Sequence, residues 1–141
     1  KLHIAVLGGG NGAFITAADL TLRGHKVTLC ELPHLEENIR GIIESKAIEL
    51  HIVGRPGIKG GVAKLDNVTT EPKETLSGAE VVLMVMPAFA QKPFAEACVP
   101  YLEDGQIIVL APGNFGGAIE FSNILLKKGR GQKVELRKWN A

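Results

Sequence analysis

Three small residues near the amino terminus constrain this chain more than any other feature. Gly8, Gly10 and Ala13 have the spacing G-x-G-x-x-A, and they directly follow the apolar run 2–7. A short apolar run that ends in glycines predicts a buried strand, and residues 12–23 predict a helix with Ala13, Ala17 and Leu20 on one face. A strand, a glycine turn and a helix in this order are the context in which the spacing binds the pyrophosphate of a dinucleotide.

Each position of this turn has its own physical role. Gly8 permits the tight turn out of the strand, and Gly10 has no side chain to keep a pyrophosphate from the main chain. Ala13 is small enough for the helix to lie close to the sheet. The unpaired N–H groups of the first helical turn and the positive end of the helix dipole then face the phosphates. The predicted cofactor-binding turn comprises Gly8, Gly9, Gly10, Asn11, Gly12 and Ala13.

Glu31 ends the second predicted strand, residues 25–31, at the distance where the dinucleotide fingerprint has an acidic residue, about 20 positions beyond the turn. Its carboxylate is suited to accept hydrogen bonds from the hydroxyls of the adenosine ribose. It also repels a 2′-phosphate, by on the order of 4 kcal/mol for charges about 4 Å apart at an effective dielectric near 20. We therefore predict NAD as cofactor. NADP stays an alternative, because Arg40 lies one helical turn further along.

The rest of the chain alternates between strand-like and helix-like segments. This alternation predicts an α/β, Rossmann-type doubly wound fold with a mainly parallel sheet. Glycines and a proline separate segments 48–53 and 62–65, which predict a hairpin inserted into the alternation. Further strands are expected at 68–70, 81–86, 106–111 and 133–136, and helices at 35–46, 92–102 and 116–127, with a helical turn at 74–77.

Two loops follow the fourth and fifth main strands. Pro87 and Ala88 close the first of these strands, and Pro112, Gly113 and Asn114 close the second. Ligands of open α/β sheets lie beyond the carboxyl ends of the strands. We therefore expect Pro87, Ala88 and Asn114 to contact the cofactor, with ordinary turns as the alternative.

Composition narrows the class of protein. The net charge is +1, and scattered lysines and arginines give no reason to expect a nucleic acid partner. The longest apolar run, 81–90, is too short to span a bilayer, so no membrane partner is expected. Cys30 and Cys98 lie in apolar stretches, which we interpret as reduced core thiols of a cytoplasmic protein without a metal site. The four histidines, for which no acidic partner was identified, are expected to be non-catalytic: His3, His25, His34 and His51.

Segments 8–14, 54–61, 85–88 and 112–121 resemble the N-terminal domain of the opine dehydrogenases, the group of octopine and nopaline dehydrogenases. The similarity extends to about residue 129, and the last segment is the most particular. This resemblance implies an NAD-dependent oxidoreductase that acts on the CH–NH bond of N-(carboxyalkyl) amino acids, formed from an amino acid and a 2-oxo acid. It also implies that the catalytic groups lie in a second, helical domain. Residues 1–141 leave no room for that domain, so we name no catalytic residue and interpret the chain as its dinucleotide-binding domain alone.

Other classes remain open. Glycerol-3-phosphate dehydrogenase-like enzymes usually have a lysine where this chain has Asn114, and ketopantoate reductase-like enzymes usually have a basic residue in place of Glu31. A non-catalytic, NAD-sensing regulatory module is the alternative from a different class. A homodimer is a further possibility. The tail 133–141 lacks the continuation that the resemblance implies, so we expect it to be truncated or of different origin.

Overall fold

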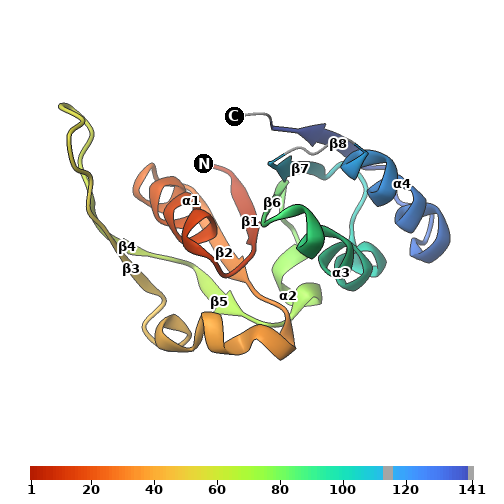
Figure 1. Cartoon of the computed structure of the whole chain (residues 1–141), viewed down its shortest axis with the longest axis horizontal. Helices are drawn as coiled ribbons and strands as arrows, with labels where there is room; N and C mark the ends of the chain where they lie inside the picture. Colours follow the sequence, from red (N-terminus) through yellow and green to blue (C-terminus); the bar gives the residue numbers. More distant parts are fainter. Residues whose placement is uncertain (113–115, 140–141) are drawn as a thin grey trace.

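The computed structural model describes residues 1–112 and 116–139 (Figure 1). Its centre is a six-stranded sheet in which all neighbouring strands are parallel. The strand order is β5-β2-β1-β6-β7-β8, which is the order 3-2-1-4-5-6 of a doubly wound dinucleotide-binding fold. This confirms the predicted fold class. The strands are β1 (His3–Leu7), β2 (Lys26–Cys30), β5 (Asn67–Thr69), β6 (Val81–Val85), β7 (Ile107–Ala111) and β8 (Glu135–Lys138).

The connections change direction between β1 and β6. From β1 the chain moves outward through β2 to β5, and then returns to β6 on the other side of β1. No crossover segment fills the space beyond the carboxyl ends of two strands that diverge in this way. The fold therefore creates a crevice at this edge of the sheet.

Helices cover the sheet on both faces. Helix α1 (Asn11–Leu22) lies on one face, where its small residues Ala13, Ala17 and Ala18 are buried against β1 and β2. The other face carries α2 (Pro72–Leu76), α3 (Ala88–Cys98) and α4 (Gly117–Lys128). The alanines of α1 allow close contact between helix and sheet, whereas α3 and α4 fill their layer with the larger Phe94 and Phe121.

The inserted hairpin consists of β3 (Ala47–Leu50) and β4 (Gly61–Lys64), which pair antiparallel with Ala47 opposite Lys64. Figure 1 shows it extending away from the sheet next to α1. The hairpin confirms the predicted insertion. The predicted strand 48–53 was too long, because residues 51–53 lie beyond the ladder and Val53 is 91% exposed.

The predicted helix 35–46 was wrong. Two short 3-10 helices stand in its place, η1 (Pro33–Asn38) and η2 (Arg40–Ile42). Of the apolar stripe Leu35, Ile39, Ile42 and Ile43, only Ile39 is fully buried. The tighter coil of a 3-10 helix repeats every three residues rather than every 3.6, so the stripe does not face the core as a whole.

Helix α3 begins at Ala88, four residues before the predicted start at residue 92. Pro87 is its N-cap, and Pro93, which a start at residue 92 would place in the first turn, lies inside the helix. Pro100 lies in the 3-10 helix η3 (Val99–Tyr101), which directly follows α3. Among the described residues, no helix has the length and apolar character needed to cross a membrane.

Candidate functional site

A groove of about 720 Å³ lies where β1 and β6 end, at the crevice described above. Its volume is in the range of small-molecule and cofactor sites, about 300–1,000 Å³. The glycine turn forms one side, the segment after β2 another, and the start of α3 a third. Residues of its lining include Gly8, Gly9, Gly10, Asn11, Gly12, Glu31, Leu35, Asn38, Val85, Met86, Pro87, Phe89 and Pro112.

Gly8 makes the tight turn that its sequence position predicts. Its φ of +135° is a conformation that favours glycine, and its N–H donates to the carbonyl of Cys30 at 2.9 Å. A Cβ atom at this position would overlap the carbonyl oxygen of Val85 and would lie 3.2 Å from the Cβ of Ala13. Gly8 therefore lets β1, β6 and α1 approach one another at the end of the groove.

Gly10 differs from Gly8, because nothing in the fold requires a glycine there. Its φ of −96° is open to any residue, and a Cβ atom would have no heavy atom within 4 Å. Gly10 is the N-cap of α1, with no side-chain hydrogen bond at the cap and no acidic residue in the first turn. The first N–H groups of a helix have no partner within it. The turn therefore presents unshielded main-chain donors to the groove, an arrangement suited to an anion.

Glu31 lies one residue beyond the end of β2 and is buried, with 3% of its surface exposed. Its Oε1 accepts from the N–H of Leu32 at 2.8 Å, and its Oε2 accepts from Nδ2 of Asn38 at 3.0 Å. A carboxylate has about four acceptor positions on its two oxygens, so two remain for hydroxyl groups in the groove. The turn and the acid thus line one groove, as the spacing in the sequence predicts.

The other predicted site residues are placed less uniformly. Pro87 lines the groove, whereas Ala88 is exposed and lies outside its lining. Ala13 is 1% exposed beneath the turn, where it supports the turn without reaching the groove. Asn114 lies outside the described residues.

Several lining residues of the groove were not predicted from the sequence, and three of them come from the helical segments after β2 and β6. Asn38 and Leu35 reach the groove from η1, and Phe89 reaches it from the first turn of α3. No local pattern marks Asn38, since its role depends on the 3-10 geometry that replaces the expected helix. Phe89 is 84% exposed, and a large apolar residue directly after a strand end was the signal that could have identified it.

A larger cavity of about 770 Å³ lies over α1 and the neighbouring faces of β6 and β7. Apolar side chains dominate it, among them Ile15, Leu83, Val109 and Trp139. The glycine turn and the buried acid are both outside its lining. The cavity also contains Arg23, His51 and Arg55, but the unpaired N–H groups at the start of α1 lie at the groove.

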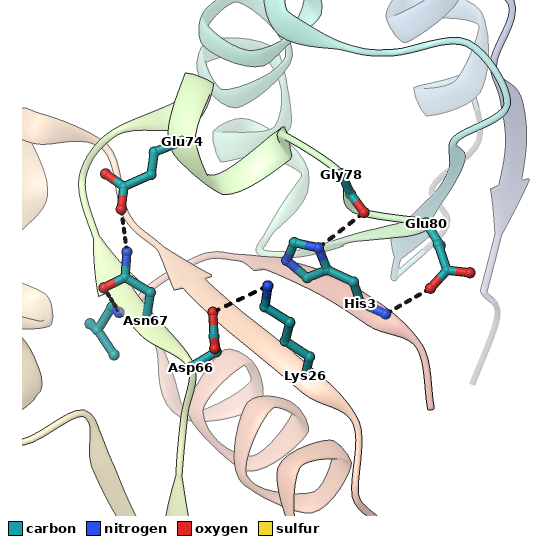
Figure 2. Close-up of polar contacts among 8 residues, drawn as sticks. His3, Lys26, Asp66, Asn67, Glu74, Gly78 and Glu80 are labelled. Atoms are coloured by element: carbon teal, nitrogen blue, oxygen red, sulfur yellow. Dashed lines mark hydrogen bonds and ion pairs between the residues drawn. The ribbon is translucent and has the colours of Figure 1, made fainter.

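The histidines do not form a site in the described part of the chain. Nδ1 of His3 donates to the carbonyl of Gly78 at 3.0 Å, and the main-chain N–H of His3 donates to the carboxylate of Glu80 at 2.9 Å. These two contacts join β1 to the segment that leads into β6 (Figure 2). These contacts are at the amino ends of the strands, opposite the groove. His25 Nδ1 accepts from the N–H of Leu2 at 3.0 Å. His51 does have an acidic neighbour, Glu49 at 3.2 Å, but both side chains are exposed on the hairpin.

Polar pairs reinforce this amino-terminal edge. Lys26 and Asp66 are 3.8 Å apart, and Nδ2 of Asn67 donates to Glu74 at 2.6 Å, both drawn in Figure 2. Among the described residues, no group of three or more histidines, cysteines or acids could hold a metal ion. The groove is the cavity in which the glycine turn and the buried carboxylate of Glu31 lie together.

The strand order, the glycine turn at the direction change and the acid beside it define the chain as a Rossmann-type α/β domain. No protein-family model matches it. The chain is 37% identical over 125 residues to an opine dehydrogenase from Arthrobacter sp. (strain 1C), covering 89% of this chain and 33% of that protein. It is 32% identical over 136 residues to an opine dehydrogenase from Haliotis discus hannai, covering 92% and 34%. The chain is thus related to the opine dehydrogenases and spans about a third of their length.

The solved structures agree. A structure of octopine dehydrogenase in complex with NADH and agmatine matches with a TM-score of 0.80 at 27% identity, covering 91% of this chain and 32% of that one. Ketopantoate reductase from Ralstonia eutropha and glycerol-3-phosphate dehydrogenase from Coxiella burnetii both match with a TM-score of 0.66, at 19% and 21% identity. Those two likenesses show the shared fold alone.

Proposed function

We propose that the groove binds NAD(H) and that the chain is the dinucleotide-binding domain of an opine dehydrogenase-like oxidoreductase. The observation that carries this proposal is the open space at Gly10. The fold accepts a side chain there, so the bare main chain at the N-terminus of α1 serves a ligand rather than the packing. The related octopine dehydrogenase structure contains NADH, which fits a dinucleotide as that ligand.

The residues of the groove divide the work of binding. The first-turn N–H groups of α1 hold the pyrophosphate, with the helix dipole adding attraction for its negative charge. Glu31 accepts hydrogen bonds from the adenosine ribose through the acceptor positions that Leu32 and Asn38 leave open. Pro87 and Phe89 form the wall at the start of α3. The nicotinamide supplies the hydride chemistry, and the protein orients it.

The charges around the groove favour NAD over NADP. Glu31 is a buried acid at the expected ribose position, and a 2′-phosphate would bring like charge against it. Arg40, the residue that kept NADP open, pairs with Glu37 at 2.8 Å. Both side chains are more than half exposed, so the pair itself is weak. Arg40 is also absent from the lining of the groove, so it does not offset the charge of Glu31 there.

For the whole protein we propose the reductive condensation of an amino acid with a 2-oxo acid, reversed as oxidation at the CH–NH bond. Octopine dehydrogenase structures with arginine and with pyruvate support these substrate classes. The chain spans about a third of its relatives, so we place the catalytic groups and the substrate domain outside residues 1–141. Two buried free thiols support a reducing compartment such as the cytoplasm. The homodimer remains a prediction for analytical ultracentrifugation.

The test is a pair of matched glycine substitutions. Gly10→Val adds a side chain at the groove, and Gly41→Val adds the same side chain in η2, where a Cβ atom likewise has no heavy atom within 4 Å. In calorimetric titrations with NADH and NADPH, we expect the wild type and Gly41→Val to bind NADH more tightly than NADPH. Gly10→Val should bind neither while its unfolding temperature stays near that of Gly41→Val. Normal NADH binding by Gly10→Val would overturn the proposal.

A further inference from the structure

The carboxylate of Glu31 is held by neighbours on both oxygens, and this arrangement has a consequence for cofactor selection. Leu32 donates its N–H to Oε1 at 2.8 Å, and Asn38 donates its side-chain amide to Oε2 at 3.0 Å. No ion pair recorded for residues 1–112 and 116–139 involves Glu31. A buried carboxylate without a cation depends on such donors to keep one orientation.

The two donors differ in origin. Leu32 is the next residue in the chain and donates from the main chain, so its contribution does not depend on side-chain identity. Asn38 is seven residues away at the end of η1, and it reaches Glu31 only through its side chain. Asn38 is therefore the one of these two donors that a side-chain substitution removes.

Gly9 is the residue of the glycine turn that contacts the Glu31–Asn38 pair. A Cβ atom at Gly9 would overlap Oε2 of Glu31 and would lie 2.9 Å from the Cβ of Asn38. The middle of the turn thus packs directly against the Glu31–Asn38 pair. Any rotation of the carboxylate away from Asn38 changes the surface on which the turn rests.

We propose that Asn38 is a positioning residue that sets the preference between NAD and NADP by fixing the Glu31 carboxylate; this inference rests on the proposed function. With both oxygens held, the carboxylate keeps its free acceptor positions available to ribose hydroxyls. It also cannot turn away from a 2′-phosphate. Without Asn38 the carboxylate gains rotational freedom, so the cost of placing a phosphate beside it falls.

A matched control exists at the opposite, amino ends of the strands. Asn67 donates its side-chain amide to Glu74 at 2.6 Å, also across seven residues, and Figure 2 shows this pair at the amino ends of the strands. Asn67→Ala therefore removes an asparagine–glutamate hydrogen bond of the same kind, remote from the groove. The experiment compares Asn38→Ala with Asn67→Ala, each with Glu31 intact and with Glu31→Gln.

The readout is the ratio of NADPH to NADH dissociation constants, with the unfolding temperature measured on the same samples. We expect Asn38→Ala to weaken NADH binding by about 10- to 150-fold, the range for losing a hydrogen bond to a charged group. NADPH binding should weaken less than NADH binding, so that the ratio of the NADPH to the NADH dissociation constant falls. In the Glu31→Gln background the same substitution should leave the ratio unchanged, because no charge remains to be positioned. Asn67→Ala should leave the ratio at its wild-type value.

Three other outcomes distinguish a failure of the proposed function from a failure of this inference. Wild-type protein that binds neither cofactor overturns the proposed function and this inference with it. Wild-type protein that binds NADH, with an Asn38→Ala variant that weakens both cofactors equally, overturns only the positioning role of Asn38. A narrowed ratio that persists in the Glu31→Gln background also overturns it, because Asn38 would then act without the carboxylate.

Discussion

The carbonyl oxygen of Val85 occupies the space that a Cβ atom of Gly8 would need. Val85 is the last residue of β6 and Gly8 directly follows β1, and these are the strands between which the chain changes direction. Gly8 therefore lines the groove and also makes room for the close approach of β6. It also separates Gly8, which the fold requires, from Gly10, which it does not.

Gly8→Ala is therefore expected to destabilise the protein. Alanine at a φ of +135° is strained, and its methyl group meets main-chain atoms that cannot move independently. We expect a loss of about 2–4 kcal/mol in the free energy of unfolding, measured by urea denaturation. Gly10→Ala should change it by no more than about 1 kcal/mol. Equal effects of the two substitutions would contradict this division of roles.

Phe89→Ala is expected to weaken cofactor binding without weakening the fold. The side chain is 84% exposed and lines the groove, so it has little packing to lose and a ligand surface to offer. Loss of an aromatic contact corresponds to about 2- to 12-fold in the NADH dissociation constant. Leu126 on α4 is also 84% exposed, and Leu126→Ala serves as the control that leaves binding unchanged. A lower unfolding temperature in Phe89→Ala alone would argue against a purely ligand-facing role.

Gln106→Leu tests a polar contact that holds the amino end of β7. The buried amide of Gln106 donates to the carbonyls of Leu76 and Ala79 at 2.8 and 3.0 Å, and its oxygen accepts from the N–H of Glu103 at 2.8 Å. Leucine fills the same space but removes all three hydrogen bonds, although the carbonyl of Leu76 keeps the N–H of Ala79 as a partner. We expect a loss of about 2–4 kcal/mol in the free energy of unfolding. Gln132 is half-buried and donates to a single carbonyl. Gln132→Leu should therefore lower the free energy of unfolding by less than Gln106→Leu in the same denaturation assay.

The two thiols predict a pH dependence of stability. Burial raises the pKa of Cys30 from 9.0 to about 11 and raises the pKa of Cys98 further. Because the folded state disfavours the thiolate, the contribution of Cys30 is complete below pH 9 and is lost as the pH rises toward 11. Between pH 8 and pH 10 the wild type should lose about 1.4 kcal/mol more than Cys30→Ala. Equal losses in urea titrations at the two pH values would show that Cys30 ionises freely in the folded protein.

The parts of the fold that were predictable from sequence are those in which neighbouring residues carry the whole signal. Continuous apolar runs identified the buried strands, and the spacing of Gly8, Gly10 and Ala13 identified the turn and the start of α1. The segment after β2 was mispredicted because its apolar residues repeat as in an α-helix. The segment forms a 3-10 helix instead, which begins at Pro33 and ends at Asn38, where the side chain of Asn38 donates to Glu31.

The sequence by itself determined the class of fold and the position of the glycine turn, because both follow from local size, polarity and spacing along the chain. The tertiary structure alone decided which residues line the groove, since Leu35, Asn38 and Phe89 come from segments that only the sheet brings together. It also decided that Gly8 is needed by the packing while Gly10 is open to a ligand. That difference depends on atoms of β6, more than seventy residues away in the chain, and no local pattern contains it.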